Sequence, residues 1–96
     1  MKIKELLTSE NKWNQGCNAR DSEGLICDIF ESKAQCFCLY GAMIRCYDDR
    51  TEAFKLIQIK VLNELKRNEN IDICRWNDDG RRTFAEVREL IEKLDI

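Results

Sequence analysis

Proline is absent from the 96-residue sequence, and glycine occurs only four times. These residues are the strongest breakers of regular structure, proline because it lacks a backbone N–H and glycine because its backbone is so little restrained. With so few breakers, helices can run long. The composition therefore predicts an all-α fold.

Histidine is also absent. A cysteine nucleophile usually needs a histidine base, so cysteine catalysis is not expected and no catalytic residue is assigned. Zinc sites usually pair cysteines at C-x2-C spacing or combine them with histidine, and this sequence offers neither arrangement. No metal ligand is predicted, and we expect the cysteines to be reduced thiols that pack as small apolar side chains. They are Cys17, Cys27, Cys36, Cys38, Cys46 and Cys74.

Phosphate-binding loops are missing as well, because neither G-x-x-x-x-G-K nor G-x-G-x-x-G occurs, and no cofactor is expected. The 16 basic and 18 acidic residues leave a formal charge of -2, which disfavours nucleic acid as a partner. The longest weakly charged run, Ala34–Ile44, is about half of the roughly 20 residues that cross a bilayer, and the first ten residues contain no apolar stretch typical of an export signal. These features predict a cytoplasmic protein with no membrane segment.

The length fits a single helical domain, residues 1–96. Apolar residues at helical spacing predict a compact small bundle of about four helices. The expected helices are Lys2–Thr8, Ser32–Tyr47, Thr51–Arg67 and Phe84–Leu94. The second of these is apolar on every side, which predicts a central, buried helix in which Gly41 is a close packing contact rather than a break.

An irregular connection, Glu10–Glu31, separates the first two expected helices. Its asparagine, aspartate, serine and glycine residues are typical of turns. A structureless loop of about 20 residues would be unusual in a compact domain, so we expect apolar residues to anchor it. These are Leu25, Ile26, Ile29 and Phe30.

The densest polar segment runs from Trp76 to Thr83. Its Asn-Asp-Asp-Gly sequence is typical of a turn, because these side chains bond to their own backbone. Thr83 and Glu86 have the spacing of a capping box, which predicts that the last helix starts at Phe84. The stretch containing Ile71 and Ile73 is interpreted as a short connection leading to this turn.

A second group of polar and aromatic residues lies in the irregular connection and matches the first in composition. The two segments can pack against each other, with arginines and acids bridging between them. Alternatively, they can form one surface that binds a partner, since tryptophan and arginine dominate interface hot spots. The candidate binding residues are Trp13, Gln15, Arg20, Asp21, Trp76, Asn77, Asp78, Arg81 and Arg82.

The order of these blocks resembles a family of small uncharacterised proteins from phages and bacteria. The matching blocks are Trp13–Gly16, Arg20–Asp21, Cys36–Ala42 and Trp76–Val87, with Arg81 standing where the family pattern has glycine. This family carries a domain of unknown function. The resemblance implies a phage or prophage origin and an intracellular helical domain, but no reaction.

The leading hypothesis is therefore a non-catalytic protein-binding module, not an enzyme, whose partner is a host or phage protein. Small phage proteins often act by stoichiometric inhibition, so a host defence complex is the specific target that the resemblance suggests. The alternative is a small enzyme or ligand-binding protein that uses the Trp76-Asn77-Asp78 segment with nearby arginines. A deep pocket at those residues would favour the alternative, and a flat or protruding surface would favour the binding module.

Overall fold

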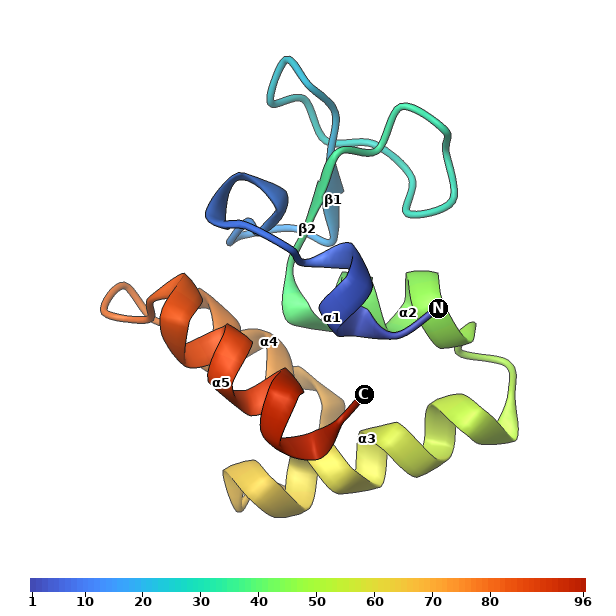
Figure 1. Cartoon of the computed structure of the whole chain (residues 1–96), viewed down its shortest axis with the longest axis vertical. Helices are drawn as coiled ribbons and strands as arrows, with labels where there is room; N and C mark the ends of the chain where they lie inside the picture. The colour runs from blue at the N-terminus through green and yellow to red at the C-terminus, as the bar shows by residue number, and fades with distance from the viewer.

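A computed structural model describes residues 1–96 (Figure 1). The fold is mostly helical but includes a small two-stranded sheet, so the all-α prediction is correct only in its main part. The elements in chain order are α1 (Ile3–Leu6), a 3-10 helix η1 (Glu10–Lys12), β1 (Ala19–Arg20), β2 (Cys36–Phe37), α2 (Leu39–Tyr47), α3 (Glu52–Leu65), α4 (Asn70–Asp78) and α5 (Phe84–Leu94).

The helices enclose one apolar core. In Figure 1, α3 crosses one end of the molecule, and α2 lies between α3 and the sheet. Helix α4 packs against α2 and α3, and α1 packs against α2 and α5. Each α-helix contributes side chains that are almost fully buried. The large side chains with no more than 1% exposure include Ile3, Leu39, Met43, Ile73 and Ile91, together with Leu7, which follows α1. None of the helices is both long enough and apolar enough to span a membrane.

The last helix is confirmed with the expected bounds. Thr83 Oγ1 accepts a hydrogen bond from the Glu86 N–H, and the Glu86 carboxylate accepts one from the Thr83 N–H, which completes the capping box. Helix α3 also begins as expected, with Thr51 as its N-cap, and it ends where Lys66 adopts a left-handed conformation. Local capping signals therefore located both helices well.

The expected helix Ser32–Tyr47 is wrong in its first half. Cys36 and Phe37 form β2, and α2 begins only at Leu39, with the Cys38 thiol as the N-cap acceptor for Gly41 N–H at 3.2 Å. The backbone before Leu39 is extended because it pairs antiparallel with β1, as Ala19 opposes Phe37. Cys36 and Cys38 therefore do not lie on the buried helix.

Gly41 confirms the predicted close packing contact. A Cβ atom at this position would lie 2.1 Å from the carbonyl oxygen of Asn18, which is far inside van der Waals contact. The backbone of the irregular connection can therefore lie directly on α2 only because residue 41 has no side chain.

The stretch expected to be a connection before Trp76 is helix α4. Glu69 and Asp72 form a capping box at its start, with the Glu69 N–H donating to the Asp72 carboxylate. Trp76, Asn77 and Asp78 therefore lie in the last turn of a helix rather than in a loop, and the turn itself comprises residues 79–81. Helix propensity is modest in this polar sequence, so burial of Ile73 in the core supplies the missing stabilisation.

The connection between β1 and β2, residues 21–35, protrudes from the helical core and is named the lobe here (Figure 1). Ile29 packs against the core, as expected for an anchor. The expectation fails for Leu25, Ile26 and Phe30, because 61%, 69% and 51% of their respective surfaces are exposed. Two loops of the lobe project these side chains outward.

Candidate functional site

The two tryptophan-bearing segments meet in space, and their contact is named the junction here, comprising residues 13–16 and 77–79. Its centre is Asn77, which is fully buried at the end of α4. Trp13 Nε1 donates to Asn77 Oδ1 at 2.7 Å, across 64 positions of sequence. The hypothesis that the segments pack together is confirmed.

The Asn77 side chain uses all of its hydrogen-bonding capacity within the protein. Its Oδ1 also accepts the Leu39 N–H at 2.9 Å, at the start of α2. Its Nδ2 donates to the Asn14 carbonyl at 3.1 Å and to the Asp78 carboxylate at 2.9 Å. An amide offers two donors and two acceptor sites, so no hydrogen-bonding group of Asn77 remains for a ligand.

Gln15 and Gly16 complete the junction by capping the end of α4. Gln15 Nε2 donates to the carbonyl oxygens of Asn77 and Asp79, both at 2.9 Å, and the Gly16 N–H donates to Asp78 Oδ1 at 3.0 Å. The last carbonyls of a helix have no partner within the helix, so these bonds satisfy groups that would otherwise need water.

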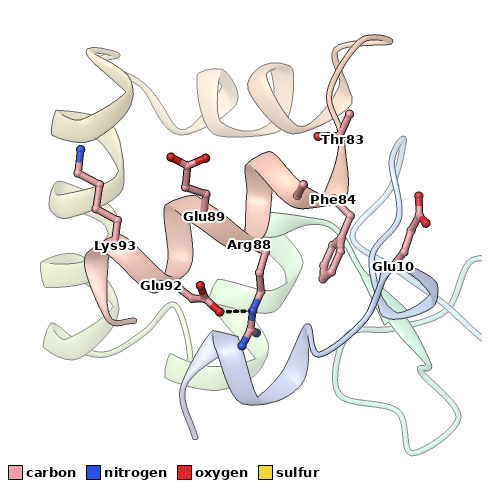
Figure 2. A pocket seen from close by; sticks show the side chains of 8 residues that line it. Glu10, Thr83, Phe84, Arg88, Glu89, Glu92 and Lys93 are labelled. Atoms are coloured by element: carbon pink, nitrogen blue, oxygen red, sulfur yellow. Dashed lines mark hydrogen bonds and ion pairs between the residues drawn. The ribbon is translucent and has the colours of Figure 1, made fainter.

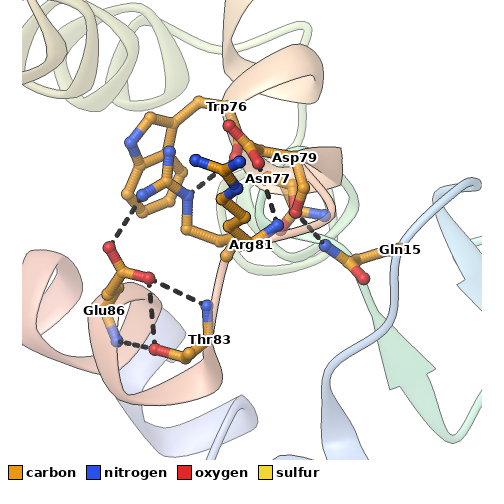
Figure 3. A network of polar contacts seen from close by, with 8 residues as sticks. Gln15, Trp76, Asn77, Asp79, Arg81, Thr83 and Glu86 are labelled. Carbon is orange, nitrogen blue, oxygen red and sulfur yellow. Dashed lines mark hydrogen bonds and ion pairs between the residues drawn. The ribbon is translucent and has the colours of Figure 1, made fainter.

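A second polar group joins α4 to the start of α5 (Figure 3). The Arg82 guanidinium stacks over the Trp76 ring at 3.9 Å from its centroid and donates to the Trp76 carbonyl at 2.9 Å. It also pairs with Glu86 at 2.9 Å. The pKa of Glu86 lies below its ordinary value, chiefly because the Thr83 N–H donates to the carboxylate and also because Arg82 is close. These contacts fix the turn between the two helices.

The expected arginine bridge between the two segments is not formed. Arg20 lies on β1 and donates to the Gly24 carbonyl at 2.9 Å, whereas Arg82 pairs with Glu86 four residues away. Asp21 accepts the N–H groups of Glu23 and Leu25. Arg20 and Asp21 therefore shape the lobe and lie outside the junction.

Arg81 differs from the other candidate residues because its side chain is exposed and makes no hydrogen bond or ion pair. Only its backbone is fixed, by an N–H bond to Asp79 Oδ1 at 2.9 Å. Its side chain is thus free to contact another molecule.

The cysteines form no disulfide, and no group of histidine, cysteine or acidic side chains is placed to hold a metal. Burial raises the pKa of Cys38 to about 12 and that of Cys46 to about 11. Both thiols therefore stay protonated and unreactive at neutral pH.

Sequence reasoning missed an exposed apolar surface that the lobe carries. Beside Ile26 and Phe30, a shallow groove of about 570 Å³ separates the lobe from α2. Six of its nine lining residues are hydrophobic, and Ile44 of α2 contributes to its wall. Apolar groups that gather around a groove are typical of a contact surface for another molecule.

The lobe is held in shape by its own polar groups. Arg45 of α2 donates to the Ile29 carbonyl at 3.0 Å, and Asp28 accepts the Phe30 N–H at 2.9 Å. Gln35 N–H donates to the Arg20 carbonyl at 2.8 Å and closes the base of the lobe. The signal that the sequence offered for this shape was the two aspartates of the lobe, Asp21 and Asp28, because each accepts a backbone N–H two residues ahead.

The other hollows are lined mainly by charged or polar residues. The largest, about 860 Å³, runs along α5 and is bordered by Glu10 (Figure 2). Within it, Arg88 pairs with Glu92 at 2.7 Å and donates to the Lys4 and Leu7 carbonyls. A smaller hollow of about 270 Å³ lies beside Trp76 and Arg82. Arg88 and Arg82 are thus engaged by partners within the protein.

Comparison with known proteins yields one match. A family model described as a family of unknown function (DUF6197) matches residues 2–94. No curated protein and no solved structure matches the chain. The coarse part of the resemblance, membership of a family of unknown function, is confirmed, and the phage origin stays a prediction.

Proposed function

The chain belongs to a family of unknown function (DUF6197), which assigns no activity. We therefore propose a function from the surface of the molecule itself. The function is that of a non-catalytic protein-binding module. Its contact surface is the lobe, with the groove between the lobe and α2 as the centre of the contact.

One observation carries this proposal: three large apolar side chains are exposed on one hydrogen-bonded connection, and two of them, Ile26 and Phe30, line the same groove. Leu25, Ile26 and Phe30 lie on 15 residues that contain no helix or strand, yet backbone and side-chain hydrogen bonds hold the whole stretch. Long irregular connections in compact domains are usually functional or disordered. A fixed shape reduces the ordering entropy that binding must overcome, so such a surface suits protein recognition.

Most of the residues that the sequence predicted as a binding surface instead hold the core and the lobe in shape. The junction braces the helical core through Trp13, Gln15 and Asn77, while Arg20 and Asp21 hold the first turn of the lobe. The alternative function, ligand binding at Trp76 with nearby arginines, finds less support. Asn77 is fully bonded, and Arg82 is held by Glu86 and stacked on Trp76.

The target class follows from the predicted phage origin. A phage protein of this size that binds another protein without catalysis would act by occupying its target, so a host defence complex remains the proposed partner. The proposed place of action is the host cytoplasm.

Affinity purification with matched variants tests this proposal. The tagged protein, its Ile26→Ser/Phe30→Ser variant and a control, Leu56→Ser/Ile59→Ser on α3, are expressed in the native host. Each pair replaces two exposed apolar residues. We expect mass spectrometry to identify a stoichiometric partner with the parent and the control that is lost with the lobe variant. Retention by the lobe variant, or loss with the α3 variant alone, contradicts the proposal.

A further inference from the structure

The lobe has an unusual charge for this chain. Residues 21–35 contain four of the 18 acidic residues but only one of the 16 basic residues, Lys33. The rest of the sequence is close to neutral. Arg20 and Arg45 donate to carbonyl oxygens of the lobe, but neither lines the groove, and the only charged residues that line it are acidic. The acids of the lobe are Asp21, Glu23, Asp28 and Glu31.

The acids border the groove while its walls are largely apolar. Asp28 of the lobe and Asp49, which follows α2, line the groove together with Ile26, Ile29 and Phe30. Asp49 makes no hydrogen bond or ion pair through its side chain, and neither does Glu23 near the tip of the lobe. These two carboxylates are therefore unpaired within the protein and available to a partner.

We propose that the groove and lobe bind a basic amphipathic segment of another protein, an inference that rests on the proposed function. Apolar side chains of the segment enter the groove beside Ile26 and Phe30, and its lysines or arginines lie against Asp28 and Asp49. Electrostatic complementarity of this kind speeds association and selects among partners.

The same charges disfavour the other occupants of such a surface. A second copy of the chain docking through the same lobe would bring acid against acid at every symmetric contact. Anionic lipid surfaces and nucleic acids would be repelled by the same carboxylates. A cationic, partly apolar polypeptide complements both the acidic side chains and the exposed apolar area.

A pair of synthetic peptides tests the chemistry directly. The first is a fluorescein-labelled 18-residue helix of leucine and lysine, and the second has the same leucine pattern with glutamate in place of lysine. Fluorescence anisotropy measures their binding to the full chain. We expect saturable binding of the lysine peptide that weakens with salt, and no binding of the glutamate peptide.

Three variants test whether the lysine peptide binds at the groove and lobe. The Ile26→Ser/Phe30→Ser variant should bind the lysine peptide with an affinity lower by about tenfold or more, because two apolar contacts are lost. The Glu23→Lys/Asp49→Lys variant should lower the affinity for the lysine peptide by about fivefold or more. The fold should not change, since neither side chain has a partner within the protein. The matched control Leu56→Ser/Glu52→Lys on α3 should bind like the parent. Equal weakening by the control, or equal binding of both peptides, overturns the inference.

These experiments distinguish failure of the basic-segment inference from failure of the proposed function. If the lobe variant loses the purified partner but the lysine peptide does not bind the parent, the lobe is an interface and the partner chemistry is wrong. Self-association of the parent through the lobe in analytical ultracentrifugation, abolished by Ile26→Ser/Phe30→Ser, likewise overturns the basic segment in favour of a second copy. If neither the partner nor the peptide depends on the lobe, both proposals are wrong.

Discussion

At the junction, polar and aromatic side chains point inward and bond to one another, whereas in the lobe apolar side chains point outward and the polar groups bond to their own backbone. Asn77 is buried and makes four hydrogen bonds. Ile26 is 69% exposed and packs against nothing in the core. The residue types that usually mark a core and a surface are exchanged between the two regions.

This difference shows that composition does not identify a binding surface. Tryptophan, asparagine and arginine are common at interfaces, but their polar groups are available to a partner only when the fold leaves them unbonded. At the junction the polar groups of Trp13 and Asn77 bond to one another, and beside it Arg82 bonds to Trp76 and Glu86. The lobe has ordinary apolar residues that the fold leaves exposed, and these are the groups available for binding.

The largest predicted effect is at the centre of the junction. Asn77→Ala leaves Trp13 Nε1, the Leu39 N–H and the Asn14 carbonyl without their partner, so it should lower the free energy of unfolding by about 3 kcal/mol or more. Urea denaturation followed by circular dichroism measures the loss. Asn63→Ala is the matched control, because Asn63 is an exposed asparagine on α3 whose side chain has no hydrogen bond. A loss of less than about 1 kcal/mol at Asn77 would show that the junction does not brace the fold.

The contact between the irregular connection and α2 should be nearly as sensitive. Gly41→Ala places a methyl group against the Asn18 carbonyl, which should cost about 1 to 3 kcal/mol through forced backbone movement. Gly80→Ala is the control, since a Cβ there meets no atom within 4 Å. Thermal melts of the two variants should separate clearly. Equal melting temperatures would mean that the connection can move away from α2 without cost.

A smaller effect is expected at the capping box that follows the junction. Thr83→Ala removes the acceptor for the Glu86 N–H and should destabilise the protein by about 1 kcal/mol. Thr83→Ser keeps the hydroxyl and should melt close to the parent. Equal stability of the alanine and serine variants would show that water replaces the hydroxyl at this helix end.

The smallest change in stability is expected in the lobe. Ile26→Ser should shift the free energy of unfolding by no more than about 0.5 kcal/mol, because its side chain is already in contact with water. Ile73→Ser, at a fully buried isoleucine of α4, provides the contrast and should be severely destabilising. Chemical denaturation of both variants sharpens the comparison. Comparable losses would place Ile26 in the core and remove the basis of the proposed binding surface.

Local signals in the sequence predicted the parts of the fold that depend on local interactions. Phe84–Leu94 has both a capping box and a clear apolar face, and it was located to the residue. The two-residue strands were missed because Cys36 is extended only through pairing with Arg20, 16 positions earlier. Helix α4 was missed because its last residues include Asn77 and Asp78, which are typical of turns, and Asn77 is buried only through contacts with a segment more than 60 positions away.

The candidate site was predicted in part. Matched composition correctly indicated that the Trp13 and Trp76 segments meet, but it assigned the wrong bonds. Arg82 lies just before α5 and pairs with Glu86 in the first turn of that helix, because an acid four positions away in sequence is close by, whereas a distant acid is not. The exposure of Leu25, Ile26 and Phe30 could not be predicted, because apolar residues are usually buried and only the three-dimensional path of the lobe shows otherwise.

The short pairing of β1 with β2 has one further consequence, for how this molecule can be changed. Because β1 and β2 hold both ends of the lobe together, the chain between them is a closed loop, and the entropy cost of such a loop rises only slowly, by about 0.6 kcal/mol for each doubling of its length. Segments of different length and sequence can therefore be grafted between Arg20 and Cys36 while the helices keep their arrangement. The lobe is in that sense modular, a replaceable insert in a frame of helices.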